Sequence, residues 1–137
     1  MNTEPMNTEP NFDNPTIELV LPIRTSYVSL LRQVAGAAAA HADITIDLLD
    51  DTKIACSEAA VLLIQHAPEN VSYSWRWYCT ENRVDVVASA PTTLTDLPDF
   101  SDMEGFTWTV LTAVAKDLTP KIAQGNLILT FSIYENA

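Results

Sequence analysis

The sequence DDTKIACSEAAVLLIQHA, Asp50 to Ala67, contains the longest apolar run of this chain. From Ile54 to Ile64 its only polar side chains are Ser57 and Glu58. A helix that is apolar on nearly all sides is buried against more than one layer of structure. An isolated carboxylate inside such a helix costs free energy unless a neighbouring group compensates it. We therefore expect Glu58 either at an edge of the core or at a functional site.

The composition indicates one acidic domain. The chain has 137 residues, of which 47% are hydrophobic, and this suffices for one ordinary core but not for two. Its 18 acids and 7 bases give a net charge of −11, which argues against binding to nucleic acid or to an anionic membrane and favours a basic or apolar partner. A membrane span needs roughly 18 to 20 apolar residues, and neither such a segment nor a secretory signal pattern is found. We expect a cytoplasmic protein.

Cysteine and histidine do not point to a disulfide framework or a metal site. Cys56 falls in the predicted helix and Cys79 at a predicted strand end, and both are interpreted as buried thiols. His41 and His66 lack Cys, Asp or His neighbours at metal-ligand spacing. Roles at helix ends or in the core are predicted for both histidines.

Hydrophobic periodicity divides the chain into a leader and one domain. Residues 1–15 begin with the tandem repeat MNTEP MNTEP, and we predict that they form a disordered leader. Residues 16–137 are predicted to form a single domain, whose elements are a strand at Thr16–Pro22, a helix from an N-cap at Ser26 to His41, a helix from about Ile46 to Ala67, a hairpin of Val71–Cys79 and Arg83–Ala90, a long loop at Pro91–Glu104, a helix at Gly105–Asp117 and a strand at Asn126–Tyr134.

Two of these elements have clear apolar faces. The first hairpin strand places Tyr73, Trp75 and Trp77 on one side, where core packing or a dimer face is favoured over base stacking because the chain is acidic. The last predicted helix is expected to bury a stripe of Phe106, Val110, Leu111 and Val114. The element order favours a two-layer α+β sandwich, with helices on one face of a mostly antiparallel sheet.

Several motifs resemble a known family. They are IELVLP from Ile17, YVSLLR from Tyr27, KIACSEA from Lys53 and QHA from Gln65. With this order of elements, residues 16–134 resemble the anti-sigma-factor serine kinases of the RsbW type, which belong to the GHKL ATPase superfamily. The resemblance implies a histidine-kinase-like (Bergerat) fold, an ATP and Mg²⁺ site, homodimerisation, and a sigma factor or an anti-anti-sigma (STAS-type) protein as partner.

The resemblance also assigns roles to single positions. Glu58 matches the catalytic base of the family, but Leu62 stands where an Asn holds Mg²⁺, and an alkyl side chain offers no ligand oxygen. Ala90 stands where the family has the Asp that reads adenine, and Thr92 where it has a glycine. In the phosphate-binding turn only Gly105 remains, with Thr107 where another glycine is expected.

These departures favour a degenerate relative that binds a sigma factor or related regulator without ATP hydrolysis, and no cofactor is expected. Glu58 is then a relic base, a buried partner of Arg or Lys, or an exposed helix residue. Arg32 matches the arginine that contacts sigma in the family, but it is equally well a solvated helix residue. Two alternatives remain open: an active ATP-dependent kinase of an anti-anti-sigma serine, and a ligand-sensing or scaffold domain.

Overall fold

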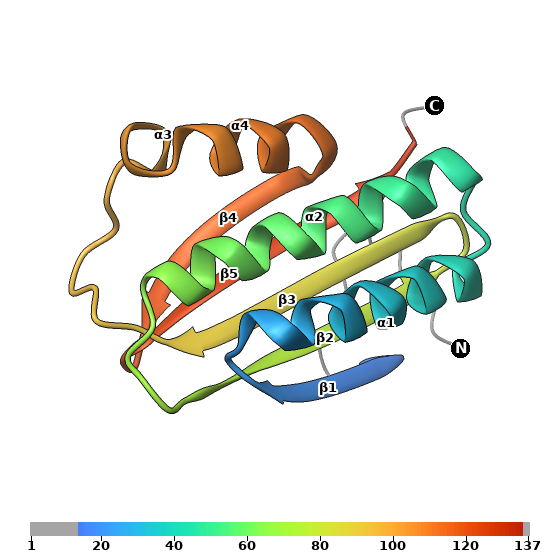
Figure 1. Cartoon of the computed structure of the whole chain (residues 1–137). Helices are drawn as coiled ribbons and strands as arrows, with labels where there is room; N and C mark the ends of the chain where they lie inside the picture. Colours follow the sequence, from blue (N-terminus) through green and yellow to red (C-terminus); the bar gives the residue numbers. More distant parts are fainter. Residues whose placement is uncertain (1–13, 136–137) are drawn as a thin grey trace, which may run out of the picture.

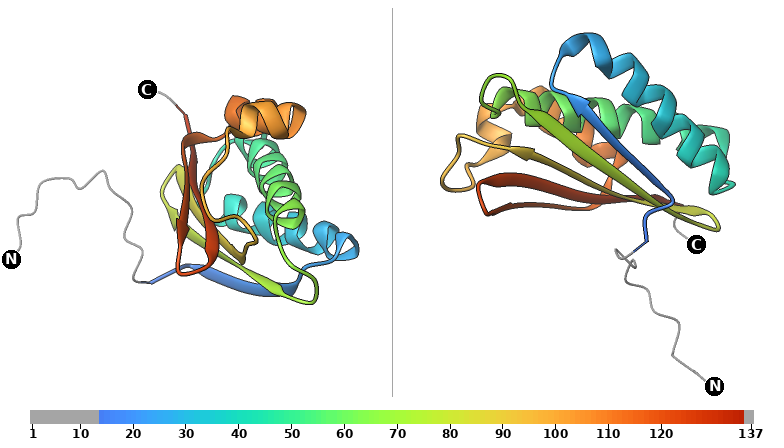
Figure 2. Two further views of the ribbon diagram at one scale, coloured as in Figure 1. Left: turned by 90° about the vertical axis from the view of Figure 1, so that its left-hand side faces the viewer. Right: turned by 90° about the horizontal axis from the view of Figure 1, so that it is seen from below.

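Five antiparallel strands form one sheet in the order β1-β2-β3-β5-β4 in the computed structural model, which describes residues 14–135. The strands are β1 (Ile17–Pro22), β2 (Ser72–Thr80), β3 (Arg83–Pro91), β4 (Lys116–Ala123) and β5 (Asn126–Tyr134). The helices α1 (Val28–His41), α2 (Ile46–Gln65), α3 (Phe100–Met103) and α4 (Gly105–Val114) cover one face of the sheet (Figures 1 and 2). The predicted two-layer α+β sandwich is confirmed. The prediction of a disordered leader lies outside the described residues, except at Asn14 and Pro15.

Most predicted elements are found within a few residues of their expected bounds. Thr45 caps α2, because its hydroxyl accepts a hydrogen bond from the Leu48 amide at 3.3 Å. The prediction of Ser26 as the N-cap of α1 is wrong, because Ser26 lies inside a short 3-10 helix, Thr25–Tyr27, and α1 begins after it without a side-chain cap. The polar residues just before α1 thus form a tighter 3-10 turn, and the α-helix begins only after them.

The region after β3 differs most from the prediction. The expected loop Pro91–Glu104 ends in the short helix α3, which Asp99 caps by accepting a hydrogen bond from the Ser101 amide at 3.0 Å. The predicted last helix ends early, and Lys116–Ala123 forms the unpredicted strand β4. Pro120 breaks the strand pattern there, and it is tolerated because β4 is at the edge of the sheet.

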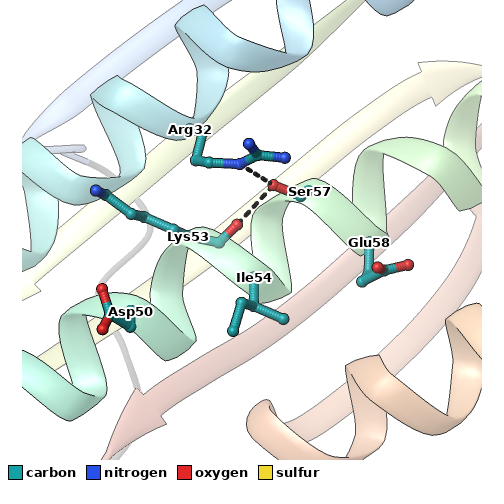
Figure 3. A pocket seen from close by; sticks show the side chains of 6 residues that line it. All are labelled: Arg32, Asp50, Lys53, Ile54, Ser57 and Glu58. Atoms are coloured by element: carbon teal, nitrogen blue, oxygen red, sulfur yellow. Dashed lines mark hydrogen bonds between the residues drawn. The ribbon is translucent and has the colours of Figure 1, made fainter.

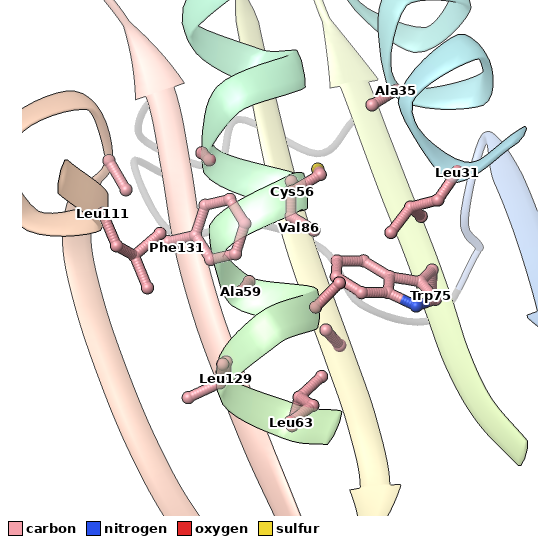
Figure 4. Packing of buried hydrophobic residues seen from close by; sticks show 14 of the residues in the cluster. Leu31, Ala35, Cys56, Ala59, Leu63, Trp75, Val86, Leu111, Leu129 and Phe131 are labelled. Atoms are coloured by element: carbon pink, nitrogen blue, oxygen red, sulfur yellow. The ribbon is translucent and has the colours of Figure 1, made fainter. Parts of the chain in front are cut away.

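The core lies between the helices and the aromatic face of β2. Trp75 and Trp77 are stacked with ring centroids 6.0 Å apart, and Tyr73 meets Trp75 edge to face at 5.4 Å. All three are buried, so core packing is confirmed for this stripe. Small side chains of α1 and α2, including Ala35 and Ala59, belong to the same core cluster as these rings, and Figure 4 shows the two helices on either side of Trp75. The small side chains let both helices approach the large rings closely.

The stripe predicted for α4 is partly wrong. Leu111 is completely buried, and it faces Phe131 of β5 in Figure 4. Phe106, in contrast, is 79% exposed. Phe106 is the second residue of α4, one turn before the part of the helix that packs on α2, so the stripe begins later than the periodicity suggested.

Leu62 lies in the same core with 0% of its surface exposed. We expect Leu62→Asn to lower the free energy of unfolding by about 2 kcal/mol or more, because apolar burial is lost and an amide is left without partners. Urea denaturation measures this change. Leu62→Met conserves the volume and is the control, with an expected loss below about 1.5 kcal/mol. An Asn variant as stable as the Met variant would show that water reaches position 62.

Cys56 provides a test of the burial of α2. Burial raises the pKa of this thiol to about 12, although its contact with Trp77 acts in the opposite direction. The reactive thiolate is therefore rare below the raised pKa, and becomes common only when unfolding restores the ordinary value. In a Cys79→Ser variant at pH 8, we expect iodoacetamide to label Cys56 at least about 100-fold more slowly without urea than with it, as measured by mass spectrometry. Equal rates would contradict the packing.

Candidate functional site

A groove of about 410 Å³ runs along the outer side of α2 beside α1 and holds two of the predicted site residues. Its lining consists of Arg32 from α1 and of Asp50, Lys53, Ile54, Ser57 and Glu58 from α2 (Figure 3). The α2 residues follow helical spacing, since positions three and four apart share one face. The segment KIACSEA thus contributes four lining residues, because positions 53, 54, 57 and 58 lie on that face.

A hydrogen-bonded chain joins the two helices across this groove. The Arg32 Nε donates to the Ser57 Oγ at 2.9 Å, and the Ser57 hydroxyl donates to the Lys53 carbonyl oxygen at 2.8 Å (Figure 3). Ser57 is buried and both its donor and an acceptor position are occupied. It is therefore held as a structural link between α1 and α2, and the Arg32 guanidinium is oriented by a buried partner while its side chain stays exposed.

Lys53 is fixed by close packing against α1. A Cβ atom placed on Gly36 would lie 2.6 Å from the Lys53 Cε. Because Gly36 has no side chain, the aliphatic stem of Lys53 can cross α1 there. The missing side chain of Gly36 thus lets Lys53 approach the backbone of α1 closely. The Lys53 ammonium therefore lies on the same side of the groove as Arg32.

The groove separates charges of opposite sign. Arg32 and Lys53 lie toward α1, while Asp50 and Glu58 lie on the outer stripe of α2 with Ile54 between them (Figure 3). Within residues 14–135, none of these four charged groups forms an ion pair. Ile54 is 40% exposed. The groove is therefore suited to a ligand that brings both charged groups and an apolar side chain.

Glu58 is half-buried at the end of this groove, with no hydrogen bond or ion pair inside the described chain. The structure thus places Glu58 and Arg32 in one groove. Of the three interpretations left open for Glu58, the ion pair with an Arg or Lys is not formed within residues 14–135. Since Ser57 lies next to Glu58 but is bonded to Lys53 and Arg32, it is not positioned as a free nucleophile.

The other positions named from the resemblance lie away from this groove. Leu62 and Ala90 are completely buried, in α2 and β3. Thr92 follows β3, and its hydroxyl donates to the His66 carbonyl oxygen at 2.9 Å. Gly105 and Thr107 begin α4, and a Cβ atom on Gly105 would have no neighbour within 4 Å. Nothing in this packing requires a glycine at position 105.

A second polar cluster joins the end of α2 to the segment before α4. The His66 Nε2 donates to the Glu104 Oε1 at 2.7 Å, and both side chains are buried. The His66 ring also meets Phe100 edge to face, and Phe100 stacks on Trp108 at 5.3 Å. The predicted helix-end or core role of His66 is confirmed. Its partner was missed, because no local pattern links His66 to an acid in a long acidic loop.

Metal-binding and membrane-spanning features are not found in residues 14–135. His, Cys, Asp and Glu side chains nowhere gather in threes as a metal ion would require. In the same range, no helix combines the length and the apolar character needed to cross a bilayer.

Curated proteins similar to this chain include serine-protein kinases named RsbW. That of Bacillus subtilis (strain 168) is 33% identical over 76 residues, which cover 53% of this chain and 48% of the relative. That of Halalkalibacterium halodurans is 27% identical over 92 residues, 66% of this chain and 53% of the relative. That of Bacillus velezensis is 34% identical over 76 residues, which cover 53% of this chain and 48% of the relative.

No family model matches this chain. The chain spans about half the length of the curated relatives that it matches. The fold agrees with the resemblance that the motifs indicated, since helices cover one face of an antiparallel sheet. The similarity to three RsbW proteins bears out that resemblance: over 53–66% of its length, the chain is similar to serine-protein kinases of the RsbW type.

Proposed function

We propose that this protein is a regulator of the anti-sigma-factor type, which acts by binding a sigma factor or another regulator of that circuit without hydrolysing ATP. The observation that carries this proposal is the groove between α1 and α2, where Arg32 is oriented by Ser57 and leaves its charge available to a partner. The similarity to RsbW proteins supports the class of partner.

The geometry of Arg32 favours a role at an interface. Arginine is enriched in interface cores because its planar guanidinium forms several hydrogen bonds in a fixed geometry. The bond from Nε to Ser57 restricts the side chain before binding, so less conformational entropy is lost when a partner arrives. Ile54, beside it in the groove, adds apolar area that a partner can cover.

The residues at the nucleotide positions support binding without catalysis. Leu62 is an alkyl side chain inside the core, and Mg²⁺ takes oxygen ligands in near-octahedral geometry. Ala90 is also buried and has no side-chain acceptor for an adenine amino group. Without a positioned metal, phosphoryl transfer loses its main electrostatic stabilisation, so these residues do not fit the ATP site of the family.

An active serine kinase is the second candidate, and the observation that favours it is Glu58. This carboxylate remains half-buried in the groove without an internal ion pair, as an acid that could accept a proton from a hydroxyl. The similar proteins are themselves named serine-protein kinases. This candidate requires a metal site built from residues other than those of the family.

The role of Arg32 is tested by substitution. A sigma factor or STAS-type protein is first captured from the native cell with the full chain, and its affinity is then measured by calorimetry. We expect Arg32→Ala to weaken the complex at least about tenfold, with little loss of thermal stability because Ser57 keeps its bond to Lys53. Arg24→Ala, an exposed arginine outside the groove, is the matched control and should retain full affinity. Equal effects of both variants would refute the assignment.

Calorimetric titration with ATP and magnesium distinguishes the two candidates. We expect no binding up to about 1 mM ATP, since no ligand oxygen is available at position 62. The measurement is repeated with Glu58→Gln, which should behave in the same way. Tight binding that depends on magnesium, and is altered in the Gln variant, would instead establish the kinase.

A further inference from the structure

Exposed apolar side chains gather in one short segment at the border of the helix layer. Leu97, Met103 and Phe106 are 47%, 55% and 79% exposed, and all lie within ten residues around α3 and the start of α4. Both helices lie beside α2 at one border of the layer (Figure 1). Grouped exposed apolar residues within a polar surrounding mark interaction sites more often than single ones do.

The charged groups in this segment are all acidic. Asp96, Asp99 and Asp102 are exposed, and the range 94–115 contains neither Lys, Arg nor His. Hydrogen bonds from Ser101 hold the pKa of Asp99 below its usual value, so this carboxylate stays charged at neutral pH. We call the exposed part of this segment, with these three aspartates and Leu97, Met103 and Phe106, the acidic edge.

The acidic edge is held in place by the layer beneath it. Glu104 is bonded to His66, and Phe100 packs between His66 and Trp108. Phe100 is thus the buried aromatic residue of this segment, and Trp108, which stacks on it, is partly buried. Phe106 is therefore presented outward on an ordered support, which lowers the conformational cost of binding.

We propose that the acidic edge binds a basic segment of a partner protein, one that carries apolar side chains among its Lys and Arg residues. The aspartates attract the basic groups, and the three apolar residues give the contact area. A second copy of this chain is disfavoured, because a symmetric contact would set aspartates against aspartates. The charge likewise disfavours nucleic acid. The surface shares no residue with the groove between α1 and α2, so this inference does not depend on the function proposed above.

A fluorescent 14-residue helical peptide of Leu and Lys serves as the probe, and anisotropy measures its binding to the full chain at low salt. We expect the double variant Met103→Ala with Phe106→Ala to bind the peptide at least tenfold more weakly than the natural chain. Ile46→Ala is the matched control, because Ile46 is 78% exposed at the far end of α2. The control should bind within twofold of the natural chain.

The charge contribution is tested separately. Asp96→Asn with Asp102→Asn should weaken binding at least fivefold, whereas Glu18→Gln with Glu81→Gln removes two exposed acids elsewhere and should have less than a twofold effect. If both double variants lost the same affinity for the peptide, net charge alone would explain the binding, and the proposal would be overturned. It would also be overturned if the natural chain bound no peptide, or if light scattering showed a dimer that Phe106→Ala dissociates.

Discussion

The burial of α2 on three sides is the constraint on which the rest of the structure depends. Small residues in the middle of this helix, such as Ala55 and Ala59, bring it close to the sheet, and the large rings of β2 fill the remaining volume. Interiors are packed as densely as organic crystals, so large rings on one layer require small side chains on the other. Helices α1 and α4 then cover the flanks of α2, and only its outer stripe remains for polar groups.

Both polar clusters follow from that placement of α2. At its middle, the buried Ser57 hydroxyl donates to the Lys53 carbonyl oxygen of α2 itself and accepts a hydrogen bond from Arg32 of α1, which orients the Arg32 side chain. At its end, the free carbonyl of His66 accepts bonds from the Thr92 hydroxyl and the Thr93 amide, both at 2.9 Å. The last carbonyls of a helix need such partners. The segment after β3 is thereby attached to α2, and the bond from His66 to Glu104 attaches the start of α4 as well.

The extent to which sequence predicted this structure varies with the range of the interactions involved. Period-two and helical patterns predicted β2, β3, β5 and α2, since each buries a regular face. Strand β4 was missed because it is a half-exposed edge strand containing Pro120. The motif around Glu58 and the resemblance predicted roles for Glu58 and Arg32; both residues line one groove, and their roles stay predictions. The bonds of Arg32 to Ser57 and of His66 to Glu104 span 25 and 38 residues, and no local pattern encodes such pairs.

The distribution of charge separates what folds this protein from what it presents to partners. Exposed ion pairs contribute only about 0 to 1 kcal/mol, so leaving Arg32 and Lys53 without internal ion pairs costs the fold little. The electrostatic interactions of the same groups become stronger once a partner excludes water from them. Stability therefore comes from the apolar packing of α2 and the sheet, and the charged groups on the outer side of the helices contribute little to it, which leaves them open to the partner contact that we propose.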